Sequence, residues 1–200
     1  YEANSFGLAS LAQLCGCQVN VYHCRDDLQT IQETVHKALE TADLLIATGG
    51  VSVGDADYVK EALEANGVQR VFWRTAVKPG KPTYFGTRGE TAVFGLPGNP
   101  LSALIMFIVF VQPFLRKRFG LPADPDMHAT LQQGLQKAAG RLEFVPCRIE
   151  NGLVMPWVQR ASHKLGELAA CNALAVLPLE ATDVLAGSNV QILPLRWGLV

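Results

Sequence analysis

The sequence predicts an α/β fold, an open, mostly parallel sheet flanked by helices, followed by a small all-β barrel-like domain. Two observations predict the first part. Stretches with helical apolar spacing alternate with β-rich runs, and the run 43–48 is continuously hydrophobic, as strands covered on both faces are. A third observation predicts the second part, because short β-like runs separated by turn residues fill the C-terminal third of the chain.

The first part contains three helical segments separated by β-rich ones. The first helix begins at Asn4, a residue type that caps helices well, and has leucines at three-residue spacing on one face. A pair of aspartates precedes the second helix, and a glycine-rich loop precedes the third. The expected elements are a helix over 4–15, a strand over 17–23, a helix over 28–41, a strand over 43–48 and a helix over 58–64.

Further β-rich runs and one long apolar helix complete the first part. The runs lie at 68–77, 82–85 and 91–94, and the helix includes Leu101 to Val111. This apolar stretch is well short of the roughly 20 residues that cross a bilayer. We therefore expect a buried core helix, with the basic residues that follow it near its negative C-terminal end.

A proline-rich stretch, 120–126, marks the expected domain boundary, because it breaks both helices and strands. The α/β domain is expected over residues 1–120 and the β domain over 127–200. The β-like runs of the second domain lie at 144–149, 153–158, 173–177 and 190–195.

Composition restricts the possible partners. A net charge of −1 gives no bulk reason to expect binding to nucleic acid or to an anionic membrane. The five cysteines are odd in number, form no C-x-x-C pair and follow no signal peptide, which predicts reduced thiols in a cytoplasmic protein. Cys15, Cys17, His23 and Cys24 match no known zinc spacing, so buried thiols are the preferred interpretation.

The loop from Thr48 to Gly54 is the first candidate site. Glycines allow close approach of the backbone to a ligand, Ser52 offers a hydroxyl, and the following helix start is positive. The loop is neither a Walker A motif nor a Rossmann fingerprint, because the required spacings are absent. The residues predict a phosphate-bearing ligand, and the alternative is an ordinary strand-to-helix turn.

Two pairs of carboxylates flank helix starts. Asp55 and Asp57 follow the glycine loop, and Asp26 and Asp27 follow the expected strand over 17–23. One aspartate of each pair can cap its helix. The other is available for a cation such as Mg²⁺, which would bridge a carboxylate and a bound phosphate. On the residues alone, capping and metal binding both stay open.

Two further motifs fit an anion site. Lys78-Pro79-Gly80-Lys81-Pro82 holds two lysines in a stiff segment, so little side-chain entropy is lost when an oxyanion binds. Leu96-Pro97-Gly98-Asn99-Pro100 leads into the long helix, where Asn99 either caps the helix or contacts a ligand and Ser102 lies in the first turn. A solvated basic turn and simple capping are the alternatives. Arg141 and the loop with Ser162 and His163 give weaker signals.

Taken together, the three motifs resemble the molybdopterin molybdenumtransferase (MoeA-like) family, which includes the gephyrin E domain. The resemblance rests on the strings 48–58, 78–82 and 96–100 in this order and spacing, and it covers nearly the whole chain. It implies insertion of molybdate into adenylylated molybdopterin with release of AMP and a Mg²⁺ requirement. It also implies a homodimer in the full-length protein, and the adenylyltransferase of the same pathway is a possible partner.

The resemblance assigns roles residue by residue. Gly49, Gly50 and Ser52 would cradle the pterin phosphate or the adenylate. Asp57 and Asp26 would be the acidic residues that position the metal ion or a water. Lys78 and Lys81 would bind molybdate or a substrate phosphate, with Arg141 and Ser162 reaching in from the β domain. The pocket would be shaped by Pro97, Gly98, Asn99, Pro100 and Ser102.

Departures from the family lead to further expectations. The family's domain begins with a strand ending in a Thr-Gly-Asp-Glu-type motif, and nothing like it precedes Tyr1 in this sequence. In addition, Arg74 stands where many members have lysine. The sequence resembles the C-terminal half of a family member, so we expect weak activity or none from it alone. One alternative is a molybdopterin adenylyltransferase or related nucleotide hydrolase, which the trailing β domain disfavours. Another is a non-catalytic scaffold, docking through residues such as Trp157, Trp197 and Leu199.

Overall fold

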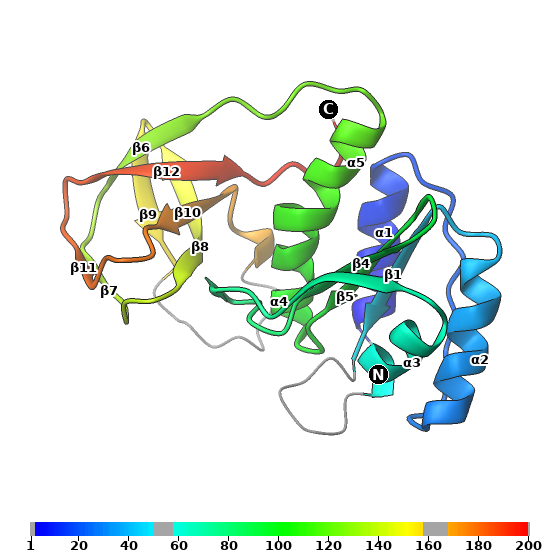
Figure 1. Ribbon diagram of the computed structural model, residues 1–200. Helices are drawn as coiled ribbons and strands as arrows, with labels where there is room; N and C mark the ends of the chain where they lie inside the picture. The colour runs from blue at the N-terminus through cyan, green and yellow to red at the C-terminus, as the bar shows by residue number, and fades with distance from the viewer. Residues whose placement is uncertain (1–2, 50–57, 158–167, 200) are drawn as a thin grey trace.

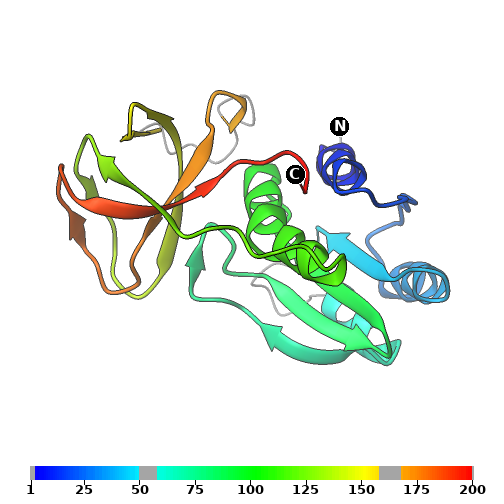
Figure 2. The same cartoon turned by 90° about the horizontal axis from the view of Figure 1, so that it is seen from above.

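The computed structural model describes residues 3–49, 58–157 and 168–199 of the chain. They form an α/β part and a β-barrel part (Figure 1). Turned by 90°, the barrel stands beside the helix that runs from α4 to α5, and the C-terminal segment returns from the barrel toward the α/β part (Figure 2). The predicted fold class, α/β followed by a small β barrel, is confirmed.

A four-stranded sheet with the order β1-β5-β4-β2 forms the centre of the α/β part. Strands β1 and β5 are parallel, whereas the pairs β5–β4 and β4–β2 are antiparallel. Among the described strands this sheet is therefore mixed rather than mostly parallel. The reason is the tight turn between β4 and β5, since so short a connection joins only antiparallel strands. The strands are β1 (Leu44–Thr48), β2 (Gln69–Trp73), β4 (Tyr84–Arg88) and β5 (Thr91–Leu96).

Helices cover both faces of this sheet. Successive side chains of β1 point to opposite sides, so they pack against different helices. Leu45 and Ala47 pack with α2 and α3 in one core cluster. Leu44 and Ile46 pack with α1 and the long helix in the other. The helices are α1 (Asn4–Leu14), α2 (Leu28–Leu39), α3 (Tyr58–Ala65), α4 (Pro100–Met106) and α5 (Gln112–Arg118).

The apolar stretch predicted as a core helix continues through a π-helical turn, η1 (Phe107–Val111), between α4 and α5. Pro113 explains the wider turn, because proline has no N–H to donate and its ring crowds the carbonyl one turn earlier. The helix Pro100–Arg118 is long and apolar enough to cross a membrane, but a buried core helix passes the same test, and 56% of its most apolar window is buried inside the fold. Met106 has no exposed surface, as expected of a core helix.

Five strands close into a barrel in the order β8-β10-β12-β6-β9 and back to β8. Its interior contains apolar side chains, among them Leu131, Val154 and Leu177. Strand β3 (Val77–Lys78) pairs parallel with β8 from outside the ring and links the two parts of the molecule. The barrel strands are β6 (Met127–Leu131), β8 (Leu142–Glu150), β9 (Leu153–Pro156), β10 (Ala173–Leu177) and β12 (Asn189–Pro194), with β7 (Leu135–Gln136) and β11 (Asp183–Val184) as a separate pair.

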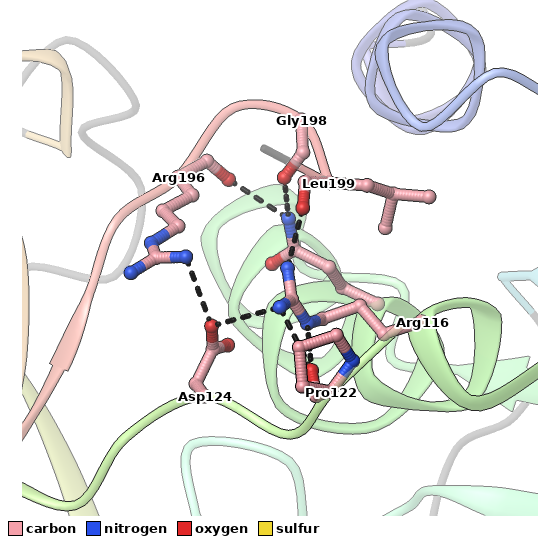
Figure 3. A network of polar contacts seen from close by, with 7 residues as sticks. Arg116, Pro122, Asp124, Arg196, Gly198 and Leu199 are labelled. Atoms are coloured by element: carbon pink, nitrogen blue, oxygen red, sulfur yellow. Dashed lines mark hydrogen bonds and ion pairs between the residues drawn. The ribbon is translucent and has the colours of Figure 1, made fainter. Parts of the chain in front are cut away.

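The C-terminal segment is fastened to α5 by a polar network (Figure 3). The guanidinium of Arg116 donates to the carbonyls of Pro122 and Leu199 and lies 3.5 Å from the carboxylate of Asp124. Arg196 reaches the same carboxylate at 3.1 Å. One buried arginine thus connects the long helix, the segment that follows it and the end of the chain.

Two local predictions, one of a strand and one of a helix cap, were wrong. Residues 17–23 do not form a strand, although they carry β-branched and aromatic side chains, because no strand of the described chain runs alongside to accept their hydrogen bonds. Asn4 does not cap α1; Ala3 occupies that position, and the amide of Asn4 is used elsewhere. Of the thiols expected to be buried, Cys15 is buried and Cys17 is half-buried, but Cys24 is exposed, so the expectation is wrong for Cys24. In the barrel Cys147 is buried, and burial raises its pKa to about 12.

Candidate functional site

The ends of β1 and β5 meet at one edge of the sheet. Because the two strands are parallel, with Thr48 opposite Leu96, both chains leave the sheet at the same edge. The Thr48 hydroxyl donates to the carbonyl of Pro97 at 3.2 Å. Gly49, with φ +79°, lies so close to Gly98 that a Cβ on Gly98 would be 3.6 Å from the Cα of Gly49. The structure thus brings the first and third sequence motifs into contact.

Asn4 joins these two strand ends to the start of α1. Its side-chain amide donates to the Thr48 hydroxyl at 2.8 Å and to the Gly98 carbonyl at 2.9 Å. Asn4 is 7% exposed, so both hydrogen bonds are shielded from water. The start of α1, the end of β1 and the end of β5 are therefore held together by one side chain.

We expect Asn4→Asp, which keeps the shape but removes both donors, to lower the free energy of unfolding by about 1–3 kcal/mol, because buried acceptors lose their partners. Urea unfolding followed by circular dichroism measures this. Gln13→Ala, an exposed change on the same helix, is the control and should change stability by less than about 0.5 kcal/mol. An equal effect of the two substitutions would contradict the bridging role of Asn4.

The start of α4 lies directly after this contact. Asn99 caps the helix: its carboxamide oxygen accepts from the backbone N–H of Ser102 at 3.2 Å, and the Ser102 hydroxyl lies 3.2 Å from the same oxygen. Pro100 occupies the first turn, where its missing N–H is not needed. Capping thus accounts for the side chain of Asn99, while the positive end of the helix still points to the edge where β1 and β5 end.

Sheet register brings the lysine motif to the same edge. Tyr84 at the start of β4 pairs with Gly95 near the end of β5, and the strands are antiparallel. The chain that carries Lys81 therefore enters the sheet at the same edge at which Pro97 and Gly98 leave it. The side chain of Lys81 is exposed. The described parts of the three motifs thus lie at one edge of the sheet.

The lysine loop is held in shape by hydrogen bonds to one glycine. The hydroxyls of Thr75 and Thr83 both donate to the carbonyl of Gly80, at 3.1 and 2.6 Å. Gly80 has φ +118°, and its Cα packs on Met106 of α4. The backbone that carries Lys78 and Lys81 is therefore held in shape by these contacts, as expected of a stiff proline-rich segment.

Lys78 is engaged by the barrel. Its ammonium lies 2.9 Å from the carboxylate of Glu143 on β8, and the two residues are register partners in the β3–β8 pair. Arg141 precedes β8 and is exposed; the next residue, Leu142, donates its N–H to the carbonyl of Ala76 at 2.8 Å. Arg141 is thus close to the segment that leads into Lys78.

Several predicted site residues lie outside the described residues: Gly50, Ser52, Asp57 and Ser162. Of the other acidic pair, Asp27 caps α2, accepting from the Thr30 N–H at 2.9 Å, and this bond lowers its pKa. Asp26 is exposed just before α2 and is the spare carboxylate. Within the described ranges no group of three metal-ligating side chains gathers, and this includes the cysteines near Cys15.

Sequence reasoning missed Glu143 and misassigned Asn4. The predicted β-like run 144–149 began one residue after Glu143; with the strand's true start at Leu142, a charged residue inside a buried strand would have signalled the need for a partner. No local signal reveals the partners of Asn4, since Thr48 and Gly98 are distant in sequence. Arg74 adds a further cation beside the site: it has φ +69° and its guanidinium stacks on Trp73, 4.1 Å from the ring centroid.

Both parts of the chain match known protein families. Residues 1–117 match the family described as "Probable molybdopterin binding domain". Residues 128–195 match the family described as "MoeA C-terminal region (domain IV)".

Curated relatives and solved structures agree with this. The chain is 37% identical over 205 residues to a molybdopterin molybdenumtransferase from Haemophilus influenzae, covering 97% of this chain and 50% of the relative. Molybdopterin molybdenumtransferase 2 from Mycobacterium tuberculosis is 34% identical, with coverages of 96% and 50%. The molybdopterin biosynthesis MoeA protein from Pyrococcus horikoshii has the same fold, with a TM-score of 0.83 and 24% identity over 98% of this chain and 48% of that one. The chain spans about half the length of the relatives it matches.

Proposed function

The chain belongs to the molybdopterin-binding domain family, and from that premise we propose that it acts in molybdenum cofactor biosynthesis as part of a molybdopterin molybdenumtransferase. The reaction would insert molybdate into adenylylated molybdopterin with release of AMP. The observation that carries the proposal is the convergence of the Gly49 loop, the Gly98 turn and the Lys81 loop on one sheet edge. The match of residues 128–195 favours the transferase over a single-domain adenylyltransferase.

The residues form two subsites, each suited to a different anionic group. Backbone N–H groups at Gly49 and Gly98, with the positive start of α4, suit the phosphate of a pterin nucleotide. Lys78 and Lys81 suit the tetrahedral oxyanion molybdate, because fixed ammonium groups bind an oxyanion with little loss of entropy. Gly50, Ser52 and Ser162 would join these two subsites, and Arg141 would approach from the barrel.

A magnesium ion is part of the proposal. Mg²⁺ binds through one or two carboxylates together with substrate phosphates, and a lone exposed carboxylate such as Asp26 fits that pattern. Asp57 would supply the second carboxylate. The ion would neutralise phosphate charge, while the lysines and helix ends orient the substrates. A homodimer of the full-length protein and contact with the pathway's adenylyltransferase in the cytoplasm complete the proposal.

The test is binding first and turnover second. Isothermal titration of the chain with molybdate should show binding that Lys81→Ala weakens by about 10–100-fold, because a charge-assisted hydrogen bond contributes about 1.5–3 kcal/mol. Lys117→Ala, an exposed change in the last turn of α5, is the matched control and should leave binding unchanged.

Turnover separates the transferase from its rivals. Adenylylated molybdopterin, molybdate and Mg²⁺ should yield AMP in the full-length protein, and Lys81→Ala should reduce the rate. ATP-dependent adenylylation of molybdopterin without molybdate would instead identify an adenylyltransferase. A chain that binds neither molybdate nor AMP would contradict the proposal and favour a scaffold.

A further inference from the structure

One buried carboxylate faces the proposed oxyanion site from the other part of the molecule. Glu143 belongs to the barrel strand β8, and Lys78 belongs to β3, which adds to that barrel from the α/β part. The Glu143 side chain is 6% exposed, whereas the Lys78 side chain is 42% exposed. Their charged atoms lie 2.9 Å apart. The ion pair is thus closed on the carboxylate side and open to solvent on the ammonium side.

The asymmetry of burial decides how the pair responds to a ligand. A carboxylate out of water is costly unless it is paired, so Glu143 has a strong preference for a cation in contact. An ammonium group has three N–H donors, and the exposed side of Lys78 leaves it within reach of a second partner. An oxyanion that approaches from solvent can therefore bind Lys78 only in the presence of the Glu143 charge.

We propose that Glu143 is the counter-charge of the oxyanion site, an inference that rests on the proposed function. It competes with a bound oxyanion for Lys78 and so weakens the site's hold on that anion. Because the ammonium is shared with Glu143, an oxyanion gains only part of the charge-assisted hydrogen bond that a lysine without a counter-charge would give it. Loss of about half of that bond weakens oxyanion binding roughly tenfold.

Both parts of the molecule contribute to this competition for the Lys78 ammonium. Because Glu143 is carried by β8 and Lys78 by β3, the pairing of these strands sets the distance between carboxylate and ammonium. The carboxylate acts through Lys78, by holding its ammonium, so it is a positioning residue rather than a catalytic one. Oxyanion affinity should therefore rise when its charge is removed and the fold is kept.

The experiment is a double-mutant cycle read out by titration with molybdate at fixed ionic strength. Glu143→Gln should tighten molybdate binding about tenfold relative to the wild type. In a Lys78→Met background the same substitution should change the affinity by less than about threefold, because the contested ammonium is gone. Glu150→Gln is the matched control: it removes an equal charge from the far end of β8, where the carboxylate pairs with Arg148, and should leave affinity unchanged.

The outcomes separate this inference from the proposed function. Unchanged or weaker binding by a folded Glu143→Gln variant overturns the inference alone, and so does equal tightening with and without Lys78. A wild-type chain that binds no molybdate, or binds it independently of Lys78 and Lys81, overturns the proposed function and the inference with it. If Glu143→Gln fails to fold, Glu143→Met fills the same buried space without charge, and the same tightening is expected.

Discussion

Gly80→Ala is expected to lower the free energy of unfolding by about 2–6 kcal/mol, as the sum of two costs. Gly80 has φ +118°, a backbone conformation that residues with a side chain rarely adopt, so alanine at this position is strained by roughly 1–3 kcal/mol. A Cβ would also lie 2.0 Å from the sulfur of Met106, which is fully buried, and overpacking of this kind costs about 1–3 kcal/mol. Urea unfolding monitored by circular dichroism gives the value.

Two companion variants separate the two costs. Gly89→Ala is a matched control, because Gly89 also has positive φ but no atom lies within 4 Å of its Cβ position; it should lose only the strain term. In a Met106→Ala background, Gly80→Ala should likewise cost only the strain, since the sulfur is no longer there. Equal losses for Gly80→Ala and Gly89→Ala would show that Met106 does not enforce the glycine.

Gly80→Ala should also weaken ligand binding at the candidate site. Gly80 accepts hydrogen bonds from Thr75 and Thr83 and lies between Lys78 and Lys81, so a shift of its backbone displaces both ammonium groups. We therefore expect molybdate affinity to fall together with stability in Gly80→Ala, and to stay near the wild-type value in Gly89→Ala.

The sequence predicted those features that local chemistry determines. The strand predicted over 43–48 is β1 (Leu44–Thr48), and its residues Leu44 to Ala47 are apolar, as a strand covered on both faces requires. Asn99 and Pro100 marked the start of α4, since the Asn99 side chain accepts from the Ser102 N–H and Pro100 has no N–H that needs a partner. The described parts of the three motifs also lie at one edge, as parallel and antiparallel pairing to β5 requires.

The remainder depended on contacts between residues distant in sequence. Residues 17–23 have strand propensity, yet a strand needs a neighbour, and propensity does not say whether one is present. Asn4 looked like a cap because capping is local, whereas its partners Thr48 and Gly98 become neighbours only when the sheet forms. Glu143 is buried because β8 lies against β3, and that pairing joins two parts of the chain separated by the long helix.

Arg116→Met is expected to lower the free energy of unfolding by about 2–4 kcal/mol, because hydrogen bonds to a charged group contribute roughly 1.5–3 kcal/mol and two carbonyls lose their donor. Arg116 is 8% exposed, so water replaces these bonds poorly. Methionine keeps most of the apolar volume, which restricts the loss to the polar contacts. Arg118→Met is the control: its nearest carboxylate, on exposed Asp43, is 4.0 Å away, and a change below about 0.5 kcal/mol is expected.

The part of the chain that becomes less stable in Arg116→Met shows whether Arg116 holds only the C-terminal segment or stabilises the whole fold. Gln112 would still hold the C-terminal segment in Arg116→Met, because its amide donates to the carbonyls of Arg196 and Gly198 at 3.0 and 2.6 Å. Limited proteolysis should therefore cleave that segment faster in Arg116→Met and faster again in the double variant with Gln112→Ala, while cleavage within the barrel lags behind. If instead all fragments appeared at one rate, Arg116 would support the whole fold and not the return of the chain onto α5.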